Sequence, residues 1–312
     1  MPLQRNTCWF LLFPILSALF YTLCNTFMRQ IAGGDAEILV AVAMKESVAF
    51  YVAVPIVVWL LWTKRAALPP WKYVGIFFCT SLLVQLLGNV LLQKSFREIG
   101  MATGVAGSWV GSLLTAPVLG VMLLHEKITK RVVFSLFLVL VALFLLTSGV
   151  RLQDGAEVAT TSSFSSPAAV RSILLCVVAG VTFACSNGIV RTMNNAGVSM
   201  FFPMLFLPGM GLFLLSLLDF WTHGTASYAA LSRSDLFYAY AAGGCNAIAY
   251  VSLILGLRYL SLVRVSIINV SQLALAPVVG YFVFQEPMNG LILSGIGLAV
   301  AGIVISNTTN KV

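Results

Sequence analysis

The sequence predicts an all-α membrane protein that crosses the bilayer several times. Apolar residues make up 60% of the 312 positions and only 9% are charged, whereas about a quarter of the residues of a soluble domain are charged. Apolar runs of about 20 residues, the length that crosses the hydrocarbon layer, recur along the chain. The longest polar stretch is only 151–170, so no soluble domain fits between the apolar runs.

Ten apolar runs are long enough to be membrane-spanning helices. They lie at 9–28, 38–62, 73–93, 103–124, 132–150, 171–190, 200–220, 236–257, 263–285 and 290–306. The first run follows Arg5, as in a signal peptide, but it is too long for one and no small-x-small cleavage site follows it. We therefore expect it to remain in the protein as the first of ten spans.

A segment of the fourth span recurs in the ninth. The motif Ala-Pro-Val-x-Gly stands at 116–120 and again at 276–280, and a glutamate follows each proline at the same spacing, as Glu126 and Glu286. Two further matches pair 21–29 with 183–191 and 95–97 with 256–258. The three offsets are 160 (116 to 276), 162 (21 to 183) and 161 (95 to 256). This agreement indicates an internal repeat.

The repeat predicts two halves of opposite orientation. Residues 151–170 form a polar linker between a first half at 1–150 and a second half at 171–312, and each half holds five of the ten runs. Because five is odd, the second half enters the membrane from the other side. The sequence therefore predicts ten transmembrane helices as two inverted five-helix repeats. This plan is typical of secondary transporters, whose binding site lies near the membrane midplane.

The distribution of basic residues predicts that both termini face the cytoplasm, because cytoplasmic loops are rich in lysine and arginine. With ten spans and the N-terminus inside, eleven basic residues fall on the inner side and six on the outer side, while Lys45 falls within a span. Membrane topology thus accounts for the net charge of +8, and we expect no nucleic-acid partner.

Polar side chains inside the spans follow helical spacing. In the third span Ser81, Gln85, Asn89 and Gln93 are four residues apart, so they share one helix face. Such amides either hydrogen-bond neighbouring helices or line a water-filled cavity. We predict a cavity, with candidate substrate-binding residues Tyr21, Asn25, Gln85, Asn89, Trp109, Asn187, Asn246, Tyr250, Asn269 and Gln272. This neutral lining suits a zwitterion or a hydroxylated metabolite better than a strong anion, which would require arginines.

Lys45 and Glu46 are adjacent charges within the apolar run 38–62. Neighbouring residues point about 100° apart on a helix, so the two need not pair with each other. In one interpretation both side chains reach the outer membrane surface. In the other they face the cavity, where one of them binds substrate or a proton. If transport is coupled to protons, Glu46 is the best single candidate, because no other acid lies as deep in a span.

Two prolines, two glutamates and several glycines bear on helix geometry. Pro117 and Pro277 lie within the fourth and ninth spans, where each can break its helix locally and contribute to gating. Glu126 and Glu286 fall at opposite membrane faces, so each is expected to close the end of its own helix and to hold nearby backbone groups or basic side chains. Glycines in the fourth and tenth spans permit close helix packing. The tenth span is also a candidate dimer contact, so we expect a monomer or a homodimer.

The ten spans, the internal repeat and the motif at 116–126 resemble the drug/metabolite transporter superfamily, and within it the EamA-type permeases. Residues 125–129 (His-Glu-Lys-Ile-Thr) are similar to that family's GERLT sequence, and residues 285–287 resemble its second copy, although His125 and Gln285 stand where the family commonly has glycine. The resemblance implies an inner-membrane carrier, often an exporter, of amino acids, other metabolites or drugs. It also implies a central cavity lined by spans one to four and six to nine, with the fifth and tenth spans peripheral.

We therefore predict a secondary transporter that exports a small polar metabolite, an amino acid or a similar zwitterionic or neutral solute, by alternating access. Its partners would be that solute and the lipid bilayer. A passive channel, or a membrane sensor or scaffold, is the alternative. We expect no enzymatic activity, cofactor or metal, because the sequence contains no phosphate loop, zinc pattern or nucleophile motif. The six cysteines form no CxxC pair and are expected to act as small apolar side chains.

Overall fold

The computed structural model describes residues 7–32, 36–99, 101–126, 128–154, 167–284 and 289–307, and every regular element within these ranges is helical. The elements are α1 (Thr7–Ala32), α2 (Ile38–Trp62), α3 (Trp71–Leu82), η1 (Leu83–Val90), α4 (Leu91–Ile99), α5 (Met101–Leu124), α6 (Lys130–Asp154), α7 (Pro167–Asn195), α8 (Phe201–His223), α9 (Ala226–Ala229), α10 (Arg233–Tyr259), α11 (Leu262–Asn269), α12 (Ser271–Phe284) and α13 (Gly290–Asn307). The π-helical segment η1 joins α3 to α4 without a break, so these three elements form one long helix.

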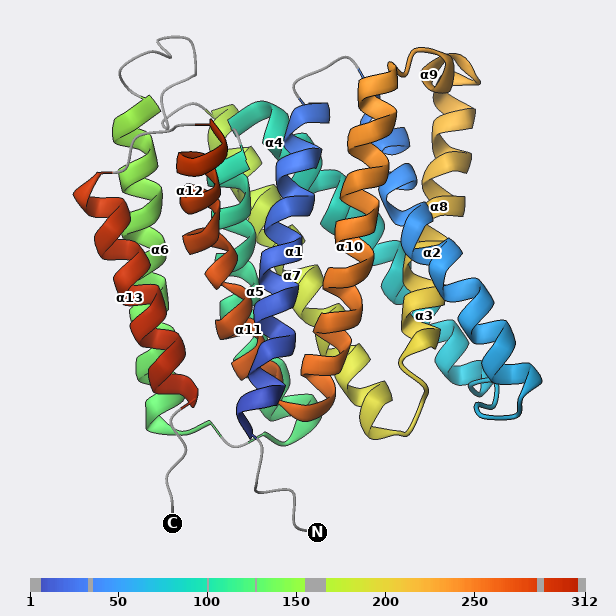
Figure 1. Ribbon diagram of the computed structural model, residues 1–312, viewed down its shortest axis with the longest axis horizontal. Helices are drawn as coiled ribbons and strands as arrows, with labels where there is room; N and C mark the ends of the chain where they lie inside the picture. The colour runs from blue at the N-terminus through green and yellow to red at the C-terminus, as the bar shows by residue number, and fades with distance from the viewer. Residues whose placement is uncertain are drawn as a thin grey trace.

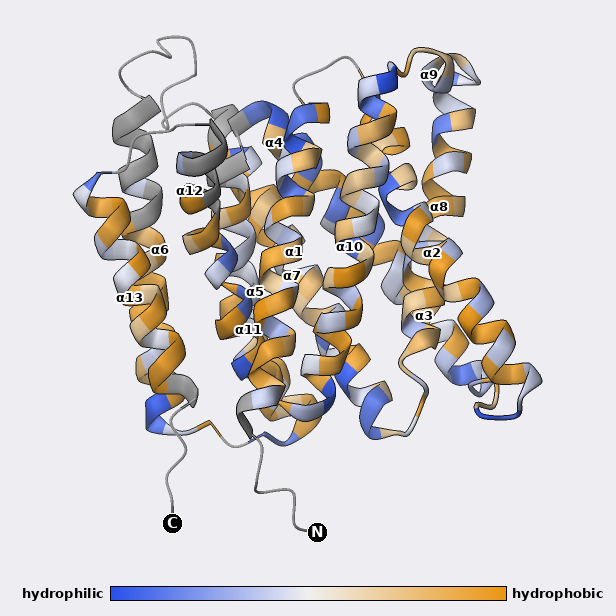
Figure 2. Ribbon diagram, in the orientation of Figure 1, coloured by the Kyte–Doolittle hydropathy of each residue, from blue (hydrophilic) through white to orange (hydrophobic). Residues whose placement is uncertain are grey.

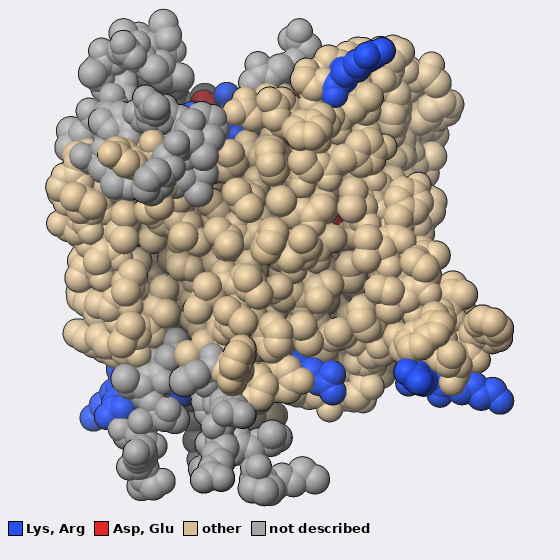
Figure 3. Space-filling model, in the orientation of Figure 1, with Lys and Arg blue, Asp and Glu red and all other residues tan. Residues whose placement is uncertain are grey.

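The lengths and composition of the helices fit a bilayer. Seven helical segments of the described residues are long and apolar enough to cross a membrane: Trp9–Ala32, Ile38–Trp62, Trp71–Glu98, Gly104–Leu124, Val170–Asn195, Phe201–His223 and Arg233–Tyr259. Hydrophobic residues predominate along the helices (Figure 2), and lysines and arginines lie near the two ends of the bundle (Figure 3). The all-α, multi-pass character is confirmed. The central part of the predicted linker, 155–166, lies outside the described residues.

The helices stand side by side in one bundle (Figure 1). α6 pairs with α13 at one edge, the place that the family resemblance implies for the fifth and tenth spans, and α2, α3 and α8 lie at the other edge. Between them α1 packs along α10, and α5 packs along α7. α1 begins and α13 ends at the same end of the bundle. We call this end the terminal face and the other end the opposite face.

Glycines set the closest helix contact, between α5 and α7. A Cβ atom on Gly111 would lie 2.1 Å from the carbonyl oxygen of Val177, and one on Gly180 would lie 1.8 Å from the carbonyl oxygen of Ser108. Because backbone atoms cannot move aside as a side chain does, the two helices approach this closely only without those Cβ atoms. The packing interpretation is therefore confirmed for these fourth-span glycines. It also holds at Gly302 of α13, where a Cβ atom would lie 2.7 Å from a methyl group of Val139 in α6, whereas a Cβ atom on Gly297 would meet nothing within 4 Å.

The helices are irregular at positions other than those predicted. α5 continues through Pro117 without interruption, because a proline removes one backbone hydrogen bond and can bend a helix without ending it. Pro277 lies within α12, and its side chain is outside the described residues. The predicted break at these prolines is therefore not seen. The irregularities are the π-helical segment η1 in the third predicted span and the junction at Val270, where α11 ends and α12 begins.

Side-chain caps fix where α10 and α11 begin. The Ser232 hydroxyl accepts a hydrogen bond from the backbone N–H of Asp235 at 3.1 Å, and the Asp235 carboxylate accepts one from the Ser232 N–H at 3.0 Å. This reciprocal arrangement satisfies two backbone donors at the start of α10. Ser261 caps α11 by accepting from the N–H of Arg264 at 3.3 Å. α11 therefore begins shortly after α10 ends, at the terminal face.

Candidate functional site, a polar cavity in the bundle

A cavity of about 160 Å³ lies inside the bundle. All ten candidate substrate-binding residues predicted from the sequence line it, together with Lys45 and Glu46. They come from α1, α2, η1, α5, α7, α10, α11 and α12, so parts of both predicted halves contribute to one wall. The wall also includes residues that sequence reasoning did not single out, among them Cys24, Ser108, Phe183, Ser186 and Leu207.

The two charges in the cavity wall pair with each other. The Lys45 Nζ lies 2.9 Å from the Glu46 Oε1, and the two residues are only 7% and 4% exposed. The surface interpretation of these residues is therefore wrong for this structure. They pair although they are neighbours on one helix, since the long lysine side chain can turn back along α2. The pair adds no net charge to the cavity.

Asn89 of η1 connects the ion pair to the polar face of the third predicted span. We call this face, formed by Ser81, Gln85, Asn89 and Gln93, the amide stripe. Lys45 donates a hydrogen bond to the Asn89 Oδ1 at 3.1 Å, and the Asn89 amide donates to the Glu46 Oε1 at 3.3 Å and to the Gln85 Oε1 at 2.8 Å. One amide thus contacts both charges. Charge-assisted hydrogen bonds of this kind are stronger than neutral ones. They hold the ends of both charged side chains toward η1.

α10 can approach the Lys45 backbone because it has a glycine there. A Cβ atom on Gly243 would lie 2.7 Å from the carbonyl oxygen of Lys45 and 2.6 Å from a methyl group of Val48. α2 is consequently packed between α8 and α10, and the part of α2 that holds the charges is buried between them. This packing turns Lys45 and Glu46 toward the interior.

The amide stripe of the third predicted span both hydrogen-bonds neighbouring helices and lines the cavity. At its ends Ser81 donates to the carbonyl oxygen of Leu207 at 2.8 Å, and Gln93 donates to that of Met28 at 3.1 Å, so these two residues connect helices. In the middle Gln85 and Asn89 line the cavity, and Gln85 also donates to Leu207 at 3.2 Å. The hydrogen-bonding interpretation therefore holds for the ends of the stripe and the cavity interpretation for its middle.

Two buried polar atoms in the cavity wall have no protein partner within the described part of the chain. They are the Tyr250 hydroxyl oxygen and the Asn269 Oδ1. Buried polar groups in folded proteins are nearly always hydrogen-bonded to protein or to water. These atoms are therefore suited to contact a polar solute. Tyr21, Trp109 and Phe183 add aromatic surface to the same cavity.

A network of charged and backbone groups ties four helix ends together at the terminal face. The Glu126 Oε1, just after α5, accepts a hydrogen bond from the N–H of Leu262 at 3.0 Å and lies 3.9 Å from the Arg191 Nε. Arg191, at the end of α7, also donates to the carbonyl oxygen of Leu257 in α10. Glu126 therefore satisfies a backbone donor at the start of α11 and holds a basic side chain, the role expected for it. Glu286 lies outside the described residues.

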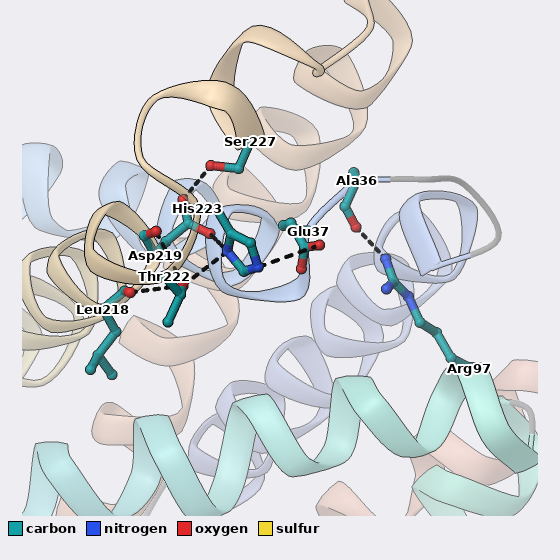
Figure 4. Close-up of polar contacts among 8 residues, drawn as sticks. All are labelled: Ala36, Glu37, Arg97, Leu218, Asp219, Thr222, His223 and Ser227. Atoms are coloured by element: carbon teal, nitrogen blue, oxygen red, sulfur yellow. Dashed lines mark hydrogen bonds and ion pairs between the residues drawn. The ribbon is translucent and has the colours of Figure 1, made fainter.

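A second polar cluster, at the opposite face, fixes the start of α2 (Figure 4). The buried Asp219 carboxylate accepts from the Ser227 hydroxyl and lies 3.2 Å from the His223 Nδ1, and the His223 Nε2 lies 3.9 Å from the Glu37 Oε1. Arg97 donates to the carbonyl oxygen of Ala36. The aspartate stands between the serine and the histidine, so the histidine does not contact the serine as it would in a hydrolase triad. The cluster connects α8 and α9 to the residues before α2.

Comparisons with known proteins agree with this architecture. Residues 167–308 match the model of the EamA-like transporter family. This part of the chain is therefore similar to the EamA-like transporter family, which belongs to the drug/metabolite transporter superfamily. No curated protein matches the chain. Of 28 matching chains of solved structures, one crystal structure superposes with a TM-score of 0.74 at 13% identity and covers 96% of each chain. At this identity the likeness shows the fold alone.

Proposed function

We propose that this EamA-like protein is a secondary transporter that exports a small zwitterionic metabolite, such as an amino acid, across the inner (cell) membrane. The observation that carries the proposal is the Lys45–Glu46 pair in an otherwise neutral, amide-lined cavity. A membrane transporter of the drug/metabolite kind is what the family match supports. The solute, its direction and the mechanism are the proposed parts.

The ion pair favours a zwitterion over a singly charged solute. A carboxylate can take the place of Glu46 beside Lys45 while an ammonium group takes the place of Lys45 beside Glu46, so every charge keeps a partner. A solute with one charge would leave either Lys45 or Glu46 buried without a partner of opposite charge. An uncompensated buried charge is strongly unfavourable. Tyr250, Asn269 and the aromatic residues would then contact the rest of the solute.

The helix contacts support two inverted repeats and alternating access. Under the predicted repeat, α1 corresponds to α7, α2 to α8, η1 with its flanking helices to α10, α5 to α11 with α12, and α6 to α13. α2 packs against α8 and α6 against α13, a pairing that a two-fold axis between the halves would allow. α7 packs along α5, whereas α1 touches α11 and α12 much less. Unequal contacts between equivalent pairs are expected when such a carrier is closed at one face only.

Charge supports a cytoplasmic terminal face. Helix ends there carry Lys64, Arg65, Lys72, Lys130, Arg131, Arg191 and Arg258, and Glu126 is the one acid that the described residues place among them. The opposite face includes the acids Glu37, Glu98, Asp219 and Asp235 as well as basic residues. Since lysine and arginine collect in cytoplasmic loops, both termini would lie in the cytoplasm.

Solute counterflow tests the proposal. Proteoliposomes are loaded with a mixture of unlabelled amino acids and given a trace of one labelled amino acid outside, one at a time. A carrier is expected to accumulate label transiently for at least one zwitterion, with a rate that saturates. A flux that never saturates and shows no transient accumulation would indicate a passive channel. No flux with any amino acid, together with transport of a singly charged solute, would contradict the zwitterion assignment.

The terminal-face network predicts a gate that can be opened by one substitution. Cys24 lines the cavity, so a variant that keeps only this cysteine reports access to the cavity. Glu126→Gln removes the charge that holds Arg191 and weakens the acceptor for the Leu262 N–H. We expect maleimide labelling of Cys24 from the terminal face to rise roughly tenfold, corresponding to about 1.4 kcal/mol.

The matched control for this gate is Glu98→Gln. Glu98 also lies 3.9 Å from an arginine, Arg171, but at the opposite face. Its substitution should leave labelling from the terminal face unchanged. Equal effects of the two substitutions would show that they loosen the whole bundle, and the gate assignment would then fail.

A further inference from the structure

The turn between α2 and α3 projects at one corner of the terminal face (Figure 1). Its large apolar side chains are strongly exposed: Trp59 is 46% exposed, Trp62 84%, Leu68 69% and Trp71 87%. Tryptophan is enriched at the boundary between lipid and water. There its apolar ring lies among the lipid headgroups while its N–H group can donate a hydrogen bond. These side chains therefore place the turn at the level of the lipid headgroups.

Three cations stand among these tryptophans without an acidic partner. Lys64, Arg65 and Lys72 are all exposed, and within the described residues none of them forms an ion pair. The sequence contains no acidic residue between Glu46 and Glu98. The Arg65 guanidinium carbon lies 4.8 Å from the centre of the Trp59 ring. One face of the guanidinium is thus covered, while its N–H groups remain available.

The backbone holds one of these cations in a conformation that favours glycine. Lys64 has φ +54°, and it follows α2 at a position where a left-handed residue ends the helix. The Cβ atom of an L-residue is crowded against the backbone in this conformation. Glycine would avoid that strain, so backbone geometry alone does not account for a lysine at this position.

The equivalent turn of the second half lacks this charge cluster. Trp62-Thr63-Lys64 at the end of α2 resembles Trp221-Thr222-His223 at the end of α8, and Ala-Ala-Leu follows in both, at 66–68 and 229–231. There the left-handed residue is Gly224, with φ +65°. That turn lies at the opposite face and is held by the Asp219 cluster (Figure 4). The basic, tryptophan-rich surface therefore belongs to the terminal-face copy alone.

We propose that residues 59–72 bind the phosphate headgroup of an anionic glycerophospholipid in the leaflet at the terminal face. Arg65 is placed to donate paired hydrogen bonds to phosphate oxygens, Lys64 and Lys72 flank it, and the tryptophans lie at the level of the headgroups. The cytoplasmic leaflet is the more anionic one, and each cation near it adds attraction. The inference rests on the proposed orientation for the name of the leaflet, and it does not depend on which solute is carried.

Lipid binding to the purified full-length protein tests this inference. The probe is phosphatidylglycerol, titrated against protein in detergent and counted as bound lipids by native mass spectrometry, with phosphatidylcholine as the neutral lipid. The test variant is Lys64→Gln/Arg65→Gln/Lys72→Gln. The control, Lys130→Gln/Arg131→Gln/Arg258→Gln, removes the same formal charge from elsewhere on the same face. Each cation near an anionic surface contributes about fivefold, so the test variant should lose on the order of a hundredfold in affinity for the first phosphatidylglycerol.

The outcomes separate a lipid headgroup site from general charge attraction and from a site for free phosphate. Equal losses in the test and control variants would show general charge attraction and overturn the proposal. So would wild-type binding that does not distinguish the two lipids, or displacement of the lipid by millimolar inorganic phosphate, which would indicate a site for free phosphate. Should the triple variant fold poorly, Lys64→His/Arg65→Gly supplies the residues that the second turn uses. It removes two cations, so a loss of about 25-fold is expected. Failure of solute counterflow would leave this result untouched.

Discussion

If transport is coupled to protons, replacing Glu46 with glutamine is expected to abolish the dependence of transport on a pH gradient and to lower the transport rate at least tenfold. The amide keeps the size of the side chain and its contact with Asn89 but cannot take up or release a proton. It also leaves Lys45 buried without its counter-charge. The measurement is uptake of the labelled solute into proteoliposomes with and without an imposed pH gradient. An unchanged pH dependence would remove Glu46 as the proton carrier.

A companion pair of variants separates solute binding from stability. Lys45→Met leaves Glu46 unpaired, and breaking a buried ion pair from one side costs about 3–5 kcal/mol. We therefore expect its melting temperature to fall by several degrees. Lys45→Met/Glu46→Gln removes both charges, and replacing a whole buried pair is often neutral, so stability should recover. Transport of a zwitterion should not recover, because neither solute charge finds its partner. A double variant that transports normally would contradict the assigned role.

The candidate site could be predicted from the sequence because side chains four residues apart share a helix face. Asn25 lies four residues after Tyr21, Asn89 after Gln85, and Tyr250 after Asn246. The structure brings these three pairs to one cavity. Apolar length likewise predicted α2 at its observed bounds. Both predictions depend only on the geometry of a single helix, which the local sequence determines.

Features that depend on neighbouring helices could not be predicted in this way. Ser81 and Gln93 share the stripe of Gln85, but they bond to carbonyl groups of α8 and α1, and the sequence does not place those groups beside them. Lys45 and Glu46 face inward because α10 packs against them at Gly243. The wider turn of η1 and the junction at Val270 also lack the proline that was expected to mark a break. For the stripe and for the two charges, contacts with other helices decided between alternatives that the local sequence left open.

Placing one methyl group at Gly180 is expected to destabilise the folded bundle strongly. In Gly180→Ala the new Cβ would lie 1.8 Å from the carbonyl oxygen of Ser108 and 2.9 Å from the N of Ser112. Neither atom can rotate away, so α5 and α7 must separate, and the hydrogen bond from the Ser112 hydroxyl to the carbonyl oxygen of Gly180, now 2.8 Å, would break. Overpacking of this kind costs about 1–3 kcal/mol and more where backbone must move, so we expect at least about 3 kcal/mol.

Thermal unfolding in detergent measures this effect, and Gly244→Ala is the matched control. Gly244 is also in a helix, α10, but a Cβ atom there meets nothing within 4 Å. Alanine favours a helix by up to about 1 kcal/mol relative to glycine, so the control should keep or slightly raise the melting temperature. Ser108 and Ser112 line the cavity and lie at this contact. Separation of α5 from α7 would therefore widen the cavity, and Gly180→Ala should lose transport even at temperatures where it stays folded. A variant that melts and transports like wild type would show that the two helices are not held together at Gly180.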